Sequence, residues 1–281
     1  MVSSVRCRGR KFSASTGKVQ YRLRYKQDAS TGATCIMAGR HCDTFNNLFV
    51  LQQLASGVTV NKAENTMVKK ILISFLFVLA SIIIYYTIVI IQARDQTPEI
   101  VHRALRSGRM KLTLHDLTKA QLDALLKVQD PNFYHHKGFD LSTPGAGVTT
   151  ISQALVKMYY FEDFKPGIQK IEQTLLSRFA FDNLIPKDTI LTLFINDVYL
   201  GEDHGRELKG FENAANYYMG KPFRDLTWDE YLSILAMIRA PSAFHYQKNK
   251  AANAERVSRI KKMLSGEYHP RDNSDWQYDR K

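Results

Sequence analysis

Cysteine is scarce in this sequence of 281 residues, and its three copies all lie near the N-terminus. Their spacing matches no metal-site pattern, and the chain after residue 70 can form no disulfide. Once tails and a membrane segment are set aside, the length suffices for one good hydrophobic core. Strand patterns are also few, so we expect a single, mainly α-helical domain. The cysteines are Cys7, Cys35 and Cys42.

Acidic residues are scarce in the first part of the chain. The net charge of the whole sequence is +12, which on its own suggests nucleic acid as a partner. Residues 1–70 carry +9 of it and leave only +3 for residues 71–281. Because the main body is close to neutral, we expect no nucleic-acid partner.

Charge is absent altogether from residues 71–91, which read ILISFLFVLASIIIYYTIVII. At 1.5 Å per residue, a helix of this length crosses a hydrocarbon core of about 30 Å. A buried core helix is the alternative, but a run that is apolar on every face suits lipid better. The run leads into QARDQ and not into a small-x-small cleavage site, so we expect a retained transmembrane anchor over 67–92.

Lysines at the start of the apolar run predict its orientation. Lys69 and Lys70 precede it on the same side as the basic N-terminal segment, so the positive-inside rule places the N-terminus in the cytoplasm. The main domain is then expected on the periplasmic side of a bacterial inner membrane. The juxtamembrane segment 93–114 is also basic, and we expect it to lie along anionic headgroups.

The segment before the anchor shows no periodicity over any long window. Residues 1–66 are therefore expected to be a disordered basic segment. Met67 stands directly before two lysines and the apolar run. An over-extended gene start is thus the other interpretation of this segment.

Capping patterns predict where the helices of the domain lie. Thr118 and Gln121 have capping-box spacing and open a short amphipathic helix that places Gln129 at its C-terminal end. A second capping box and a terminal proline bound a helix over residues 227–241. The last amphipathic helix ends at Gly266, a suitable C-cap.

Glycine and proline gather in the segment 142–161, STPGAGVTTISQALVKMYYF. It reads as a loop that feeds a helix, and its hydroxyl and backbone N–H groups near the helix start could hold an anion. An ordinary capped helix with a solvated Lys157 is the alternative.

Five motifs then follow in an order typical of one enzyme family. Residues 129–140, QDPNFYHHKGFD, match the pattern E-D-x-x-F-x-x-H-x-G-x-D everywhere but at its first letter. Residues 147–158, GVTTISQALVKM, match G-G-S-T-I-T-Q-Q-L-x-K-N in part. Three weaker motifs follow, with departures from the family pattern. The residues that they and the second motif retain are Thr150, Gln153, Lys157, Glu172, Lys187, Asn196 and the stretch 230–241.

Over about residues 115–246 the chain thus resembles the peptidoglycan glycosyltransferases of glycosyltransferase family 51, the transglycosylase domains of class A penicillin-binding proteins and their monofunctional relatives. The resemblance implies a lysozyme-like helical domain over 115–266, held against the membrane, that polymerises lipid II into a growing glycan strand. Residues 267–281 are expected to be a polar tail. Since no transpeptidase domain follows, we expect a separate transpeptidase as a partner.

The resemblance also implies the roles of individual residues. It places Gln129, Asp130 and Glu172 at catalytic positions. Cations and donors would hold the departing diphosphate, with a divalent cation (Mg or Mn) bridging it to Glu172. Adjacent histidines seldom point at one ion, so we expect no metal site at His135 and His136. The substrate-binding positions are His136, Thr150, Gln153, Lys157, Lys187 and Asn196.

Gln129 stands where the family has the Glu that acts as general base on the acceptor's 4-hydroxyl. An amide accepts a hydrogen bond from a hydroxyl but cannot take its proton. Three interpretations follow. Asp130 has taken over the role of the base, the enzyme runs slowly on positioning and leaving-group stabilisation, or the domain is a non-catalytic scaffold that binds lipid II.

Overall fold

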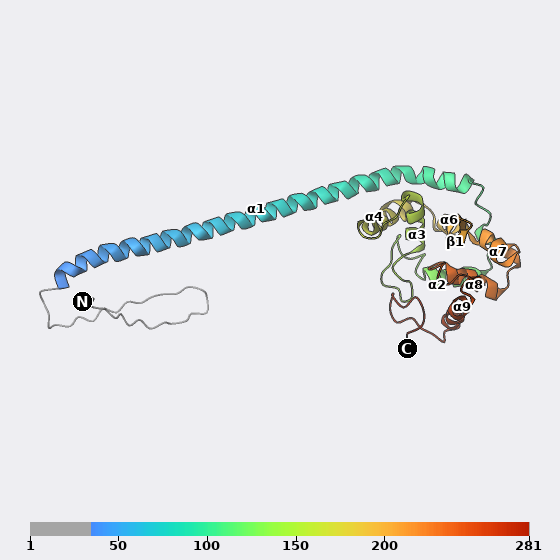
Figure 1. Cartoon of the computed structure of the whole chain (residues 1–281). Helices are drawn as coiled ribbons and strands as arrows, with labels where there is room; N and C mark the ends of the chain where they lie inside the picture. Colours follow the sequence, from blue (N-terminus) through green and yellow to red (C-terminus); the bar gives the residue numbers. More distant parts are fainter. Residues whose placement is uncertain (1–34, 281) are drawn as a thin grey trace. The chain divides into compact units, whose positions relative to one another are not determined.

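The computed structural model in Figure 1 describes the backbone of residues 35–280 and the side chains of residues 66–280 apart from residue 203. The chain divides into two compact units, Met1–Phe77 and Val78–Lys281, and helix α1 (Cys35–Arg106) crosses the boundary between them. The helix begins inside the segment for which the sequence predicted disorder. No proline precedes Pro98, so nothing in the backbone stops a helix there. The remainder of that predicted segment lies outside the described residues.

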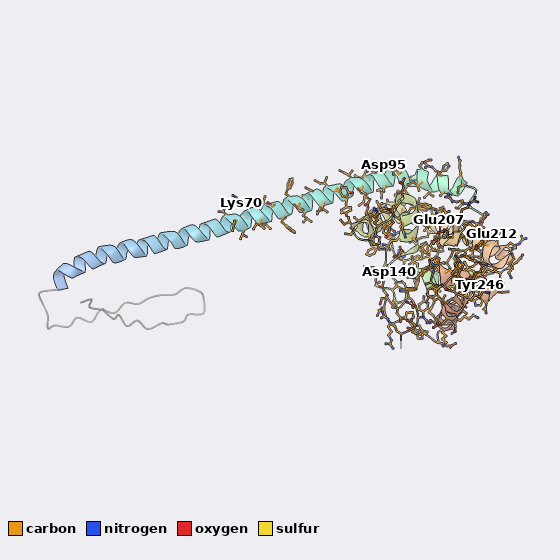
Figure 2. All side chains as sticks on the ribbon, viewed as in Figure 1. Lys70, Asp95, Asp140, Glu207, Glu212 and Tyr246 are labelled. Atoms are coloured by element: carbon orange, nitrogen blue, oxygen red, sulfur yellow. The ribbon has the colours of Figure 1, made fainter. Side chains whose placement is uncertain are left out.

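The apolar part of α1 is exposed. Thr66–Arg106 is the one stretch of the described helices that is long and apolar enough to cross a membrane, by length and composition. Side chains such as Ile71 and Phe77 are 66% and 73% exposed, and Figure 2 shows the side chains of this part projecting from the ribbon between Lys70 and Asp95. So large an uncovered apolar surface is what a lipid-facing helix presents. The anchor over 67–92 stays a prediction.

The last turns of α1 pack on the domain. Ala93 and Ala104 belong to its hydrophobic core, and Thr97 is fully buried. The Thr97 hydroxyl donates to the Ala93 carbonyl at 2.6 Å and lies 2.5 Å from the hydroxyl of Tyr160. These turns therefore pack one face on the domain, and the expectation that segment 93–114 lies along lipid headgroups stays a prediction. Small residues at helical spacing form the face of these turns that packs on the domain. The prediction for this segment was based only on its charged residues.

The unit from residue 78 onward is mainly helical, as predicted. Helix α8 packs against α2 and α9, whereas α3 packs against α4 and α6. The described helices after α1 are α2 (Lys119–Gln129), α3 (Ile151–Tyr160), α4 (Ile168–Leu176), α5 (Asp182–Leu184), α6 (Lys187–Asp197), α7 (Phe211–Met219), α8 (Trp228–Met237) and α9 (Lys250–Ser265), with a π turn at Ser177–Phe181 and 3-10 turns at Leu114–Asp116 and Phe223–Asp225.

The predicted caps are confirmed. Thr118 accepts from the backbone N–H of Gln121 at 3.2 Å, while the Gln121 side chain accepts from the Thr118 N–H at 2.8 Å. The corresponding box opens α8, and Gly266 closes α9 with φ of 82°. Helix α8 ends at Met237, earlier than the proline that was expected to stop it.

A β-hairpin follows α6 and was not predicted. Strands β1 (Tyr199–Asp203) and β2 (Arg206–Lys209) pair antiparallel, with a register irregularity near the start of β1. Neither strand alternates apolar and polar residues, which is the pattern on which a sequence prediction depends. The turn between them contains His204, whose φ is 46°, and Gly205.

The C-terminal segment is not the polar tail that the sequence predicted. Tyr278 and Asp275 are 3% and 1% exposed. The Asp275 carboxylate accepts from the Tyr268 hydroxyl at 2.7 Å and from the Arg271 N–H at 3.1 Å. The aromatic side chains that bury this segment are not regularly spaced. Its sequence therefore shows no periodicity from which its burial could be predicted.

Candidate functional site

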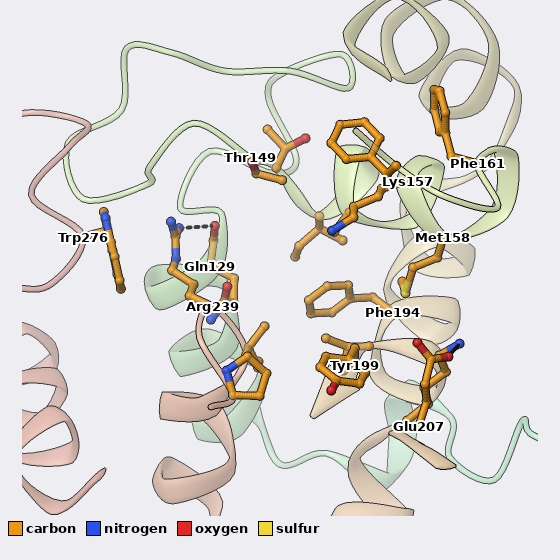
Figure 3. A pocket seen from close by; sticks show the side chains of 18 of the residues that line it. Gln129, Thr149, Lys157, Met158, Phe161, Phe194, Tyr199, Glu207, Arg239 and Trp276 are labelled. Carbon is orange, nitrogen blue, oxygen red and sulfur yellow. Dashed lines mark hydrogen bonds and ion pairs between the residues drawn. The ribbon is translucent and has the colours of Figure 1, made fainter. Parts of the chain in front are cut away.

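A pocket of about 670 Å³ lies where the first two motifs meet. The end of α2, one side of α3, the end of α6, the hairpin and the turn after α8 form its walls, and Trp276 adds a residue from the C-terminal segment. In Figure 3, Gln129 and Arg239 face the pocket from one side and Lys157 and Phe161 from the other. Of the residues implied by the resemblance, three line this pocket: Gln129, Thr150 and Lys157.

Gln129 is the last residue of α2 and is 6% exposed. Its backbone carbonyl accepts from the Arg239 guanidinium at 3.2 Å. Its side-chain Nε2 is buried and has no hydrogen-bond partner among the described residues. A buried donor without a partner is unfavourable unless a ligand or water satisfies it. Gln129 lines the pocket, with this unpartnered Nε2 shielded from solvent.

Asp130 is buried and fully engaged. Its two carboxylate oxygens lie 2.9 and 3.0 Å from Nε2 of His136, and Oδ2 also accepts from the backbone N–H of Ile151 at 3.0 Å. Nδ1 of His136 accepts from the N–H of Gly138, so the hydrogen of the neutral ring is on Nε2. Asp130 therefore joins the first motif to the start of α3. It does not line the pocket, which disfavours the interpretation that it replaces the general base.

Thr150 and Gln153 form the capping box of α3. The Thr150 hydroxyl donates to the Gly138 carbonyl at 2.8 Å and accepts from the Gln153 N–H at 3.2 Å. The Gln153 side chain donates to the hydroxyl of Thr174 on α4 at 2.9 Å. These contacts explain why the second motif needs these residue types: they hold the helix start in place and join it to α4.

Two neighbouring ammonium groups come from α3 and α4. Lys157 lines the pocket, and its Nζ lies 5.4 Å from the ring centre of Phe164; the described residues offer it no acidic partner within ion-pair distance. Lys170 on α4 donates to the Thr149 hydroxyl at 3.1 Å. Burial and the proximity of Lys157 lower the pKa of Lys170. Two neighbouring cations without counter-charges are suited to an anion. Lys170, which stands two residues before Glu172, was not predicted from the sequence.

Lys187 lies outside the pocket. Its ammonium donates to the His136 carbonyl at 3.0 Å and to the buried carboxylate of Asp182 at 2.8 Å, and it lies 4.3 Å from the ring centre of Phe133. These contacts give Lys187 a structural role at the first motif.

Asn196 is likewise occupied by the fold. Its Oδ1 accepts from the backbone N–H groups of Lys111 and Leu112 at 2.8 and 3.0 Å. Its Nδ2 donates to the carbonyls of Leu112 and Thr192 at 2.7 and 2.8 Å. An amide can make about four hydrogen bonds, so this side chain is saturated and secures the segment before α2.

Glu172 does not line the pocket. It is half-buried on α4, and no hydrogen bond or ion pair to it is found among the described side chains. Residues two apart on a helix face different ways, and Lys170 is the residue that donates to Thr149. The catalytic role of Glu172 remains what the resemblance implies.

A resident metal ion does not fit the residues present. Across the described residues, no three His, Cys, Asp or Glu side chains gather into a group that could hold one. A divalent cation would depend on the oxygens of a bound diphosphate for most of its ligands.

Several residues that line the pocket were not predicted from the sequence. Arg239 follows α8 and lies half-buried beside Gln129, and partial desolvation lowers its pKa. Tyr199 and Glu207 come from the unpredicted hairpin, where burial and two neighbouring glutamates raise the pKa of Tyr199. The only signal for Arg239 was a single charge in the apolar run ILAMIRAP.

The family model described as transglycosylase matches residues 98–265, more than half of the chain. The chain belongs to the transglycosylase family. This confirms the resemblance drawn from the motifs, and the match begins within the last turns of α1 that pack on the core.

Curated relatives agree with this assignment. The chain is similar to penicillin-binding protein 1B of Escherichia coli, with 28% identity over 51% of this chain and 18% of the relative. It is similar to penicillin-binding protein 1A of Vibrio cholerae, with 27% identity over 63% of this chain and 22% of the relative. Penicillin-binding protein 1F of Bacillus subtilis is 26% identical over 61% and 25% of the two chains. The transglycosylase chain thus spans about a fifth to a quarter of these relatives.

Proposed function

We propose that this chain is a membrane-anchored peptidoglycan glycosyltransferase that polymerises lipid II into glycan strands. The pocket carries the proposal: it brings Gln129, at the position of the family's general base, to one wall and the free ammonium of Lys157 to the other. Family membership and the relatives named penicillin-binding proteins support it.

The proposed reaction is a displacement at the anomeric carbon of the donor's muramyl sugar. The acceptor's 4-hydroxyl oxygen forms the new bond, the bond from the anomeric carbon to the diphosphate oxygen breaks, and the lipid diphosphate leaves. Lys157 and Lys170 would stabilise the negative charge that develops on the diphosphate. Gln129 would orient the hydroxyl, whose proton passes to solvent because an amide cannot take it.

A scaffold that binds lipid II without polymerising it is the second candidate. Gln129 favours it, because this residue lines the pocket at the position of the general base and an amide cannot take a proton. Purified full-length protein in detergent, mixed with lipid II, separates the two. Polymer supports the enzyme, and binding without polymer from either Gln129 or Gln129→Glu protein supports the scaffold.

The proposed setting is the bacterial inner membrane, with one pass over 67–92 and the domain on the periplasmic side. The exposed apolar surface of α1 supports the anchor. A phosphatase fused after residue 110 should be active in the periplasm. An inactive fusion there, with an active one at the N-terminus, would reverse the orientation. The proposed partners are lipid II, the growing strand and a separate transpeptidase, with no nucleic acid.

A further inference from the structure

Residues 270–278, called the C-terminal strap from here on, lie beyond the family match yet bind the loop of the second motif. The backbone N–H groups of Gly145 and Gly147 donate to the carbonyls of Asp272 and Asn273 at 2.9 and 2.7 Å. The Asn273 side chain donates back to the Gly147 carbonyl at 2.7 Å. Three hydrogen bonds thus fix residues 143–147, called the Gly-rich loop below.

The strap also contacts two arginines, the half-buried Arg239 and the buried Arg256. The Arg239 and Arg256 guanidinium carbons lie 5.5 and 5.3 Å from the ring centre of Trp276, and Arg256 lies 4.7 Å from that of Tyr278. Desolvation lowers the pKa of both guanidiniums. That of Arg256 falls to about 10, so Arg256 stays charged at pH 7. Buried charge is costly, and aromatic faces reduce that cost.

Arg239 connects the strap to the position of the general base. Its guanidinium donates to the carbonyls of Gln129 and Ala146, and thus joins the end of α2 to the Gly-rich loop. Gly147 leaves room for it, since a Cβ there would overlap the guanidinium. Figure 3 shows Trp276, Arg239 and Gln129 side by side at one end of the pocket.

We propose that the C-terminal strap is a positioning element of the substrate site, with Trp276 and Asn273 as its positioning residues. Asn273 holds the Gly-rich loop, and Trp276 holds Arg239 and through it Gln129. The strap thereby keeps the pocket in the shape that binds the lipid-linked sugar diphosphate. The ligand in this inference rests on the proposed function. The hydrogen bonds by which the strap fixes the Gly-rich loop do not depend on that function.

Hydrogen exchange of the full chain in detergent tests that order without any ligand. Asn273→Ala should speed exchange of the Gly145 and Gly147 amides about fivefold, the effect of one ordinary hydrogen bond, and leave the amides of α8 unchanged. Trp276→Ala should do the same, whereas Trp276→Phe, which keeps an aromatic face, should restore most of the protection. Gln277→Ala is the matched control, because Gln277 neither lines the pocket nor makes a hydrogen bond among the described residues. Unchanged exchange in Asn273→Ala and Trp276→Ala overturns the inference.

Ligand binding tests the positioning role. The sequence has two tryptophans, so Trp228→Phe leaves Trp276 as the sole emitter. Its fluorescence should change saturably with lipid II, and in that background Asn273→Ala should raise the Kd at least about fivefold. Faster exchange with an unchanged Kd would make the strap merely structural. If radiolabelled lipid II does not bind to the natural protein, the proposed function is wrong and lipid II is not the ligand. The exchange data alone then decide whether the strap orders the Gly-rich loop.

Discussion

Asp130→Asn distinguishes a structural carboxylate from a substitute general base. The natural carboxylate accepts from Nε2 of His136 and from the N–H of Ile151. An Asn in its place has one oxygen and one NH2 group, so one of these two donors must face another donor. His136 cannot relieve the conflict by changing tautomer, because Nδ1 already accepts from Gly138.

The size of the effect follows from those contacts. A hydrogen bond to a charged group contributes about 1.5–3 kcal/mol, and an unsatisfied buried donor costs about 1–3 kcal/mol. We therefore expect the free energy of unfolding to fall by about 3 kcal/mol. For a domain of this size, that lowers Tm by roughly 6–12 °C.

Thermal unfolding of the detergent-solubilised protein, followed by near-UV circular dichroism, measures this change. Asp123→Asn is the control, since it makes the same substitution on an exposed position of α2 and should leave Tm unchanged. An unchanged Tm in Asp130→Asn, together with a complete loss of polymerisation, would refute the structural role and make Asp130 the base.

Three further predictions concern Asp140, Lys157 and Glu172. Hydrogen bonds from Thr143, Ser142 and Asn132 outweigh the effect of burial and hold the pKa of Asp140 below its ordinary value of 3.8. The stability that they provide is present above that pH and is lost as the pH falls below it, so Asp140→Asn should cost about 1–3 kcal/mol in urea unfolding at pH 7 and progressively less below pH 3.8. Lys157→Met should weaken lipid II binding about tenfold at low salt and less at high salt, and an equal loss at both would exclude a charge effect. Glu172→Gln should abolish polymerisation and leave Tm unchanged, and unaltered turnover would contradict the role that the resemblance implies.

Capping boxes and hydrophobic spacing correctly predicted helices whose ends depend on neighbouring residues in the sequence. The capping box at Thr118 and the spacing of the leucines after it placed Gln129 at the end of α2, where the structure has it. Arg239 and Trp276 reach the same pocket from segments more than a hundred residues away in sequence. The positions of Arg239 and Trp276 depend on tertiary packing, which cannot be predicted from the spacing of residues within one segment.

Motif matching also assigned binding roles to residues that the fold uses. Asn196 is retained from the family motif, yet its four hydrogen bonds all go to backbone groups. Lys187 is retained too, and it pairs with Asp182. A sequence motif does not distinguish a residue that contacts substrate from one that shapes the site.

Polymerisation of lipid II by the purified natural protein and by Gln129→Glu tests the central claim most directly. A positioned general base contributes about 10² to 10⁴ in rate, and the two side chains have nearly the same shape. We predict that the natural protein binds lipid II but polymerises it slowly, and that Gln129→Glu raises the rate at least about tenfold. Fast polymerisation by the natural protein, lost on Gln129→Glu, would contradict the account.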